Sequence, residues 1–209
     1  GMGRFGSHLC RNLAKLGNEV MIVDQDEELL EPLLPYVTDA KIGDCTKEEV
    51  LKSLGVGNFD KCVVCVGTNF QSSLEITCLL KELGAKFVVS KATRDVQAKF
   101  LLRNGADRII YPDRDIAEKS AVQYSSDSIF DYFELSENFS IYELAPLPEW
   151  IGKTIVEMDI RNKYHTNIIA IQAKDGIQAM PPANYCFKEE EHLLMIGKNE
   201  DIQKLVRKY

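Results

Sequence analysis

Apolar residues in the first 125 positions alternate between helical spacing and short continuous runs. Helical spacing covers 5–16, 46–54, 74–83 and 100–104, whereas continuous runs cover 20–23, 62–66, 87–89 and 109–110. A glycine follows each helical segment, at positions 17, 55, 84 and 105, where a left-handed cap would end the helix. Continuous apolar strands that alternate with helices are typical of a parallel sheet covered on both faces, so we expect a doubly wound α/β domain.

The pattern changes after about residue 125. Residues 115–124 predict one more helix, and a polar break follows at 125–128. Alternating positions at 168–171, a hairpin signal at Asp175-Gly176 and a strand over 192–196 then predict a small α+β domain. We therefore expect a first domain over 1–125, a linker over 126–138 and a second domain over 139–209.

The chain opens with Gly1-Met2-Gly3-Arg4-Phe5-Gly6, a GxGxxG pattern at the start of an amphipathic helix. A buried strand then ends in Asp24, which completes the context of a dinucleotide-binding fingerprint and predicts a Rossmann-like fold. Gly1 permits the tight turn, Gly3 the approach of a pyrophosphate, and Gly6 close packing of the helix. Asp24 would bind ribose hydroxyls and repel a 2′-phosphate, which disfavours NADP. A doubly wound sheet also needs a strand before Gly1, so we expect that this segment has been left out.

Further polar residues follow the predicted strands, where a ligand of such a sheet would lie. A guanidinium at Arg4 would clamp a phosphate in bidentate fashion, Lys91 and Arg94 would meet phosphates, and Asp44 would meet the adenine end. Thr46, at capping-box spacing from Glu49, and Asn69 are explained equally well as helix caps. The predicted cofactor-binding residues are Gly1, Gly3, Arg4, Phe5, Gly6, Asp24, Asp44, Cys45, Gly67, Thr68, Asn69, Lys91 and Arg94.

Composition narrows the class of protein. The 209 residues carry a formal net charge of −7, and 45% of them are hydrophobic. The acidic balance, without a Lys/Arg run, argues against nucleic acid as a partner. No stretch approaches the length of a membrane span, so we expect a cytoplasmic protein. The six cysteines are scattered along the chain, and we expect free thiols. The one CxxC pair, Cys62 and Cys65, lies in a predicted strand, where residues three apart point to opposite faces.

Six short motifs occur in a fixed order along the chain. They are Gly-x-Gly-Arg-Phe-Gly, the strand end at Asp24, Gly43-Asp44-Cys-Thr, Gly67-Thr-Asn, Lys91-Ala and Gly105-Ala-Asp-Arg-Ile-Ile-x-Pro112. This ordered set resembles the RCK (regulator of K⁺ conductance) family, with a TrkA-N-like domain and a TrkA-C-like domain from about residue 136. The resemblance is strongest to cytoplasmic regulatory subunits of Trk/Ktr-type potassium uptake systems.

The resemblance implies a non-catalytic gating role at the inner face of the cell membrane. Such subunits form homodimers that assemble into rings, typically octamers, on a membrane potassium transporter or channel subunit. ATP, ADP or NAD(H) in the first domain changes the dimer geometry, with Arg4 as phosphate sensor and Asp24 as ribose anchor. Asp113 matches an acidic position that approaches the γ-phosphate with a divalent cation, Mg²⁺ or Ca²⁺. The helix from Asp115 resembles the helix that crosses between protomers.

The second domain resembles the cyclic di-AMP site of the Ktr branch. The residues that carry this resemblance are Ile160, Arg161, Asn167, Ile168, Ile169 and Pro182. Aliphatic side chains would sandwich adenine, and the arginine would meet phosphate. A packed core strand with a surface arginine explains the same residues equally well.

Two other functions fit the first domain. An NAD-dependent oxidoreductase would need a proton donor beside the nicotinamide. His8, His165 and His192 stand in no recognisable catalytic motif, so we expect no enzymatic activity. A regulator of a different membrane protein, such as an antiporter, would use the same two domains, and the sequence leaves that alternative open.

Overall fold

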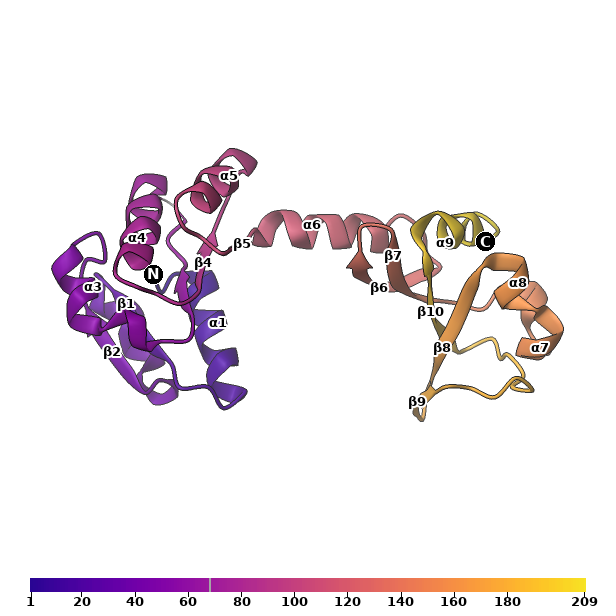
Figure 1. The fold of residues 1–209 in the computed structure, drawn as a ribbon. Coiled ribbons are helices and arrows are strands. Elements are labelled where there is room, and N and C mark those ends of the chain that lie inside the picture. Colours follow the sequence, from indigo (N-terminus) through magenta and orange to yellow (C-terminus); the bar gives the residue numbers. More distant parts are fainter. Residues whose placement is uncertain (68) are drawn as a thin grey trace. The chain divides into compact units, whose positions relative to one another are not determined.

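A computed structural model describes residues 1–67 and 69–209, which form two compact units, Gly1–Arg114 and Asp115–Tyr209. Figure 1 traces both along the chain. The predicted ligand residue Thr68 lies outside the described residues. The boundary between the units falls within α6 (Pro112–Gln123). Each unit is described by itself.

The N-terminal unit alternates helices with parallel strands, as the apolar pattern predicts. Its elements are α1 (Arg4–Lys15), β1 (Met21–Asp24), α2 (Glu27–Leu30), a 3-10 helix (Glu31–Tyr36), β2 (Asp39–Ile42), α3 (Glu48–Leu54), a 3-10 helix (Val56–Asn58), β3 (Cys62–Val64), α4 (Phe70–Glu82), β4 (Val88–Lys91), α5 (Asp95–Arg103) and β5 (Arg108–Ile110). The strands pair in parallel as β1-β2 and as β3-β4-β5. The Rossmann-like α/β fold is thereby confirmed, with its described strands divided between two sheets.

Four glycines end helices in this unit. Their φ angles are +82° at Gly17, +64° at Gly55, +85° at Gly84 and +109° at Gly105. All four lie in the left-handed region that glycine adopts without the steric cost of a Cβ. The predicted helix ends are confirmed at each of them.

The capping box predicted at Thr46 and Glu49 is wrong. Helix α3 begins at Glu48, with Lys47 at the cap position and no side-chain cap. The Thr46 hydroxyl instead donates to Asp44 Oδ1 at 2.7 Å. Asp44 is two residues away and takes the short local bond before the helix begins.

The C-terminal unit is an antiparallel sheet with helices. After α6 come β6 (Ile129–Ser136), β7 (Phe139–Leu144), a 3-10 helix (Pro148–Trp150), α7 (Ile155–Met158), α8 (Ile160–Tyr164), β8 (Thr166–Ala173), β9 (Gly176–Ala179), β10 (His192–Lys198) and α9 (Asn199–Val206). The strand order is β6-β7-β10-β8-β9. The predicted hairpin is confirmed, since β8 and β9 pair across a turn at Lys174 and Asp175. The predicted strand at 192–196 corresponds to β10.

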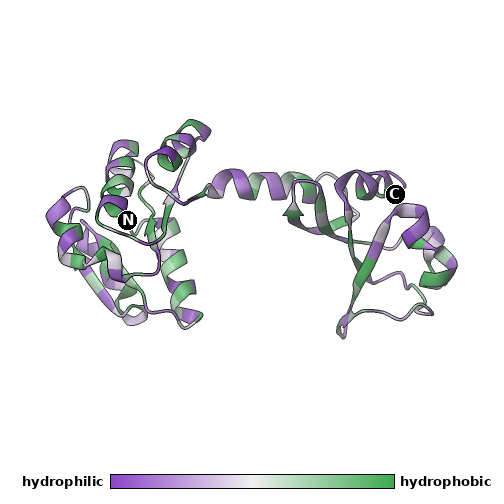
Figure 2. Ribbon diagram, viewed as in Figure 1, coloured by the Kyte–Doolittle hydropathy of each residue, from purple (hydrophilic) through white to green (hydrophobic). Residues whose placement is uncertain are grey.

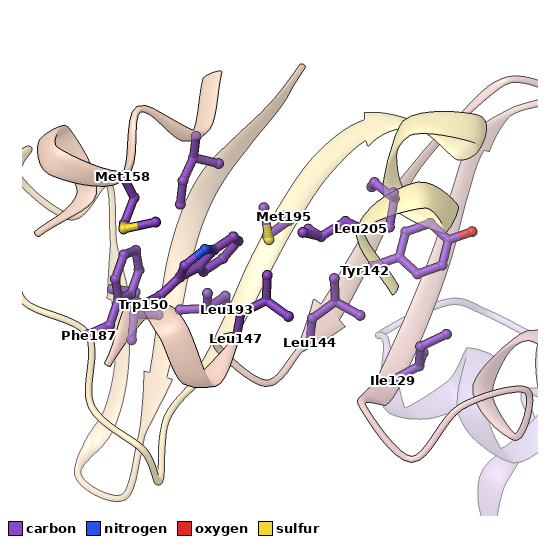
Figure 3. Close-up of a cluster of buried hydrophobic side chains, with 13 residues drawn as sticks. Ile129, Tyr142, Leu144, Leu147, Trp150, Met158, Phe187, Leu193, Met195 and Leu205 are labelled. Atoms are coloured by element: carbon purple, nitrogen blue, oxygen red, sulfur yellow. The ribbon is translucent and has the colours of Figure 1, made fainter. Parts of the chain in front are cut away.

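Trp150 is fully buried in the second unit's core. Figure 3 shows Met158 and Phe187 on one side of its ring, with Leu193 and Met195 on the other. The centroids of the Trp150 and Phe187 rings are 5.6 Å apart. This single cluster joins both sheet and helices, which makes the C-terminal unit a continuously packed body.

Helix α6 differs from the other long helices, because none of its residues is buried. Figure 2 shows it as largely hydrophilic. Lys119 connects it to β6, with an ion pair to Asp131 at 2.8 Å and a cation–π contact to Phe133. None of the described helices has the length and apolar character needed to cross a membrane. All six cysteines are free thiols, as predicted.

Candidate functional site

The glycine loop packs tightly between β1 and α1. A Cβ on Gly6 would lie 2.2 Å from the Gly1 carbonyl oxygen, and a Cβ on Gly1 would lie 3.0 Å from Val66. At Gly3, by contrast, a Cβ would meet no atom within 4 Å. Gly6 and Gly1 therefore serve close packing, whereas Gly3 leaves backbone open to an incoming group. That is the arrangement a pyrophosphate needs at a helix N-terminus.

Asp24 ends β1 directly beside this loop. Its Oδ2 accepts the Met2 backbone N–H at 2.5 Å, and its Oδ1 accepts the Asp26 backbone N–H at 3.0 Å. Partial burial alone would raise the pKa of this carboxyl, but these amide donors outweigh it and lower the pKa. Asp24 is therefore an anion across the neutral pH range. Each oxygen still has acceptor capacity for a hydroxyl group.

A cavity opens where these elements meet. Its polar portion is lined by the glycine loop, by residues that follow β1, β2 and β3, and by the end of β4. Its apolar portion lies between β1 and β3, where Ile22, Val64 and Leu80 line it. A nucleotide needs the polar portion, because the apolar portion offers no partners for phosphates.

The structure brings most of the predicted cofactor-binding residues to this cavity. Gly1, Gly3, Arg4, Phe5, Asp24, Cys45, Gly67, Asn69 and Lys91 line it. Arg4 is the first residue of α1, so its charge adds to the positive end of the helix. Lys91 Nζ lies 5.6 Å from the centroid of the Phe5 ring and would be 3.2 Å from a Cβ on Gly67. Arg4 and Lys91, with Lys61, are thus the cations that line the cavity.

Three other predicted residues lie outside the cavity lining in the described part of the chain. Gly6 is buried beneath the loop. Asp44 accepts both the backbone N–H and the hydroxyl of Thr46, at 2.9 and 2.7 Å. Arg94 is the residue before α5 and makes no side-chain cap. The structure does not bring Asp44 or Arg94 to the wall of the cavity.

Three cysteines line the cavity, Cys45, Cys62 and Cys65. Burial raises the pKa of the Cys45 thiol and of the Cys65 thiol. Both are therefore neutral thiols at neutral pH, and they contribute small polarisable surface rather than a nucleophile. The sequence singled out Cys45 only.

Sequence reasoning missed Met2, Gln25 and Thr93. The Met2 amide donates a hydrogen bond to Asp24. Gln25 and Thr93 line the cavity. The backbone carbonyl of Thr93 accepts a hydrogen bond from the Tyr111 hydroxyl at 2.8 Å. A position just after a parallel strand was the available signal for Gln25 and Thr93. No residue-type signal marks a backbone amide such as that of Met2.

Asp113 also lines the cavity. The described residues contain no group of three or more His, Cys, Asp or Glu side chains that could hold a metal ion. A cation at Asp113 would therefore need further oxygen ligands, such as those of a phosphate.

In the C-terminal unit, the predicted second-effector residues divide between core and surface. Ile160 is 3% exposed and belongs to the core, and Ile168 packs partly against it. Asn167 and Pro182 are exposed. Arg161 Nε donates to Asn167 Oδ1 at 2.8 Å, which joins two of the polar candidates.

Two family models match the chain. The TrkA-N domain matches residues 1–112, and the TrkA-C domain matches residues 139–209. Among curated relatives, Ktr system potassium uptake protein C of Bacillus subtilis is 39% identical over 100% of this chain and 94% of its own length. Ktr system potassium uptake protein A of the same organism is 36% identical over 98% of this chain and 92% of its own.

Solved structures resemble the fold. The GsuK RCK domain matches with a TM-score of 0.65 and 18% identity, over 96% of this chain and 44% of that one. The GsuK channel bound to NAD matches with a TM-score of 0.65 and 17% identity, over 93% of this chain and 36% of that one. The chain thus spans less than half the length of these structures.

Proposed function

Because the chain belongs to the TrkA-N/TrkA-C family that includes the Ktr potassium uptake proteins, we propose that it is a nucleotide-binding regulatory subunit that gates a membrane potassium transporter or channel. Within the expected domains, nucleotide binding is assigned to residues 1–125 and a second effector to 139–209, and the expected linker over 126–138 contains β6 (Ile129–Ser136), a strand of the second unit's sheet. The subunit acts from the cytoplasmic side, at the inner face of the cell membrane, through its transporter partner.

One observation carries this proposal: the glycine loop, the cations Arg4 and Lys91 and the carboxylate of Asp24 are among the groups that line a single cavity. Arg4 directly follows the open backbone at Gly3, Lys91 ends β4, and Asp24 ends β1. Phosphates fit the cationic side, and ribose hydroxyls fit the carboxylate. The ligand class is therefore an adenine nucleotide, ATP or ADP, or the dinucleotide NAD(H). The NAD-bound GsuK channel, which shares the fold, is consistent with this class.

Gating follows from differential binding. A ligand moves an equilibrium between two assembly states only by binding one of them more tightly. We assign the assembly to a homodimer that builds a ring, an octamer by family resemblance. ATP and ADP differ only in the γ-phosphate, so Arg4 and Asp113 are the groups positioned to discriminate between them. Asp113 would share a divalent cation, Mg²⁺ or Ca²⁺, with that phosphate.

The second effector site is assigned to the surface beside α8 and β8. Arg161 and Asn167 are already joined there, and Ile169 and Pro182 supply apolar surface. Ile160 and Ile168 support this surface from the core side. Cyclic di-AMP fits these groups, because its phosphates need a cation and its adenines need aliphatic contact.

An oxidoreductase is the alternative from another class. The three histidines are not among the residues that line the described cavity, so a nicotinamide there would lack an imidazole proton donor. We therefore assign no reaction to the site. Turnover of NADH with small carbonyl substrates would overturn this assignment.

A thermal-shift panel tests the ligand class. Ligands that bind the folded state raise the melting temperature, so we expect shifts with ATP, ADP or NAD(H), and with cyclic di-AMP. The Arg4→Ala variant should lose the nucleotide shift and keep the cyclic di-AMP shift, because the two sites lie in different units. Absence of a shift with every nucleotide would contradict nucleotide binding.

Potassium uptake tests the regulatory role. Cells that express the chain together with the membrane subunit of a Ktr system should take up potassium faster than cells with that subunit alone. Arg4→Ala should reduce this difference, and Arg103→Ala, at an exposed arginine in the last turn of α5, should not. Equal uptake with Arg4→Ala and wild type would contradict control by the nucleotide.

A further inference from the structure

Asp24 makes a contact that ribose binding does not require. Its two carboxylate oxygens accept backbone amides from two segments, the Met2 N–H at 2.5 Å and the Asp26 N–H at 3.0 Å. Met2 lies inside the glycine loop, 22 residues away in sequence. The carboxylate therefore connects the loop to the turn that leads from β1 into α2.

The loop is fixed from two directions at Met2. Its side chain is 7% exposed and packs in a core cluster with Cys10, Ile22 and Leu33. Its amide is held by a charged acceptor, which makes a stronger bond than a neutral one. Gly1 and Gly3 flank Met2, and glycine loses more conformational freedom on ordering than any other residue, so this anchoring limits the freedom of the loop.

We propose that Asp24 is a positioning residue for the phosphate-binding loop, holding Gly1–Gly3 in its binding conformation before the nucleotide arrives. The inference rests on the proposed function, since it assumes that phosphates bind at this loop. A carboxylate has about four acceptor sites, of which the two amides occupy two, so the ribose diol can still bind. One side chain thereby serves both the ribose and the phosphate parts of the ligand, and preorganisation of the loop adds to affinity.

A nucleotide without ribose hydroxyls separates the two roles. Calorimetry should compare ATP with 2′,3′-dideoxy-ATP for the wild type and Asp24→Ala. Loss of the loop contact should weaken dideoxy-ATP binding by about tenfold or more, the factor expected for a bond to a charged group. Asp39→Ala is the matched control, because Asp39 is an exposed carboxylate whose bond goes to the neighbouring Ala40 amide. If Asp24→Ala weakens ATP only and leaves dideoxy-ATP unchanged, Asp24 contacts ribose alone and the proposal fails.

A second measurement needs no ligand. Amide exchange followed by NMR should be faster at Met2 in Asp24→Ala than in the wild type, and unchanged in Asp39→Ala. If Asp24→Ala does not fold, Asp24→Asn replaces it, since its amide nitrogen takes the place of one acceptor oxygen and should speed exchange at Met2 or Asp26. Unchanged exchange at these amides overturns the proposal. If the wild type binds no nucleotide, the proposed function fails, and the exchange result still decides the role of Asp24.

Discussion

The two units place their apolar residues differently. In the C-terminal unit, 13 buried residues from strands and helices form one cluster around Trp150. In the described residues of the N-terminal unit, the buried side chains divide into separate clusters. The polar loops at the strand ends line the candidate ligand cavity. The first unit therefore carries its candidate ligand residues on loops at strand ends, whereas the second is organised around one continuous core.

The largest effect should come from the second core. Leu193 is fully buried, so Leu193→Ala should destabilise the C-terminal unit by about 2–5 kcal/mol. Urea unfolding followed by fluorescence of Trp150, the one tryptophan of the chain, measures this directly. Leu135→Ala is the control, because Leu135 is 55% exposed. Nucleotide affinity measured without urea should be unchanged in both variants, and a loss with Leu193→Ala would contradict the separation of the two roles.

The next effect should come from the ligand cavity. Arg4→Ala removes a charged donor from the loop and should weaken ATP and ADP binding by about 1.5–3 kcal/mol, with little change in stability because Arg4 is exposed. Calorimetric titration measures the affinity, and Arg103→Ala controls for loss of an exposed positive charge. Equal affinities for the wild type and Arg4→Ala would contradict the assignment of Arg4 as the residue that binds the nucleotide phosphates.

Alkaline pH should affect the two units unequally. Burial, together with Tyr132, raises the pKa of Tyr142 to about 12, from an ordinary value near 10. A raised pKa means that the folded state favours the neutral phenol, so this stability is present below pH 10 and is lost as pH rises toward 12. The loss should approach about 2 kcal/mol in the C-terminal unit. Urea titrations between pH 9 and 12 should show a shallower decline for Tyr142→Phe, and an identical decline would exclude Tyr142 as the cause.

The smallest effect separates two identical sequence patterns, one in each unit. Thr154 and Glu157 form a complete capping box on α7, whereas Thr46 does not cap α3. Thr154→Ala should therefore cost the C-terminal unit about 1 kcal/mol. Thr46→Ala should leave the helicity of α3 unchanged, which amide exchange over 48–54 would report. Fraying of α3 in Thr46→Ala would show that the Thr46 side chain does support the helix.

The sequence predicts those elements whose signals are local. Helix ends are reliable because a glycine at positive φ needs no tertiary partner, as at Gly17 and Gly55. Strand β2 went unpredicted, because Asp39–Ile42 is short, mixed in polarity and paired with β1 alone. The 3-10 helix over 31–36 also went unpredicted, because it contains two prolines, which usually interrupt a helix.

For the candidate site, strand-end positions identify the right neighbourhood but not which side chains face the cavity. Lys91 lies at the end of β4 and reaches it, whereas Arg94, three residues later, does not. Asp44 is held by Thr46 through short local bonds that the strand pattern does not reveal. The bond from the Met2 amide to Asp24 joins residues far apart in sequence and emerges only from the fold.

Calorimetric titration of the wild-type chain with ATP, ADP and NAD⁺ tests the central claim most directly. If the cavity beside the glycine loop is a nucleotide site, at least one of these ligands should bind saturably with one site per chain, and Arg4→Ala should weaken it. Absence of binding for all three, or binding that Arg4→Ala and Asp24→Ala both leave unchanged, would contradict the account.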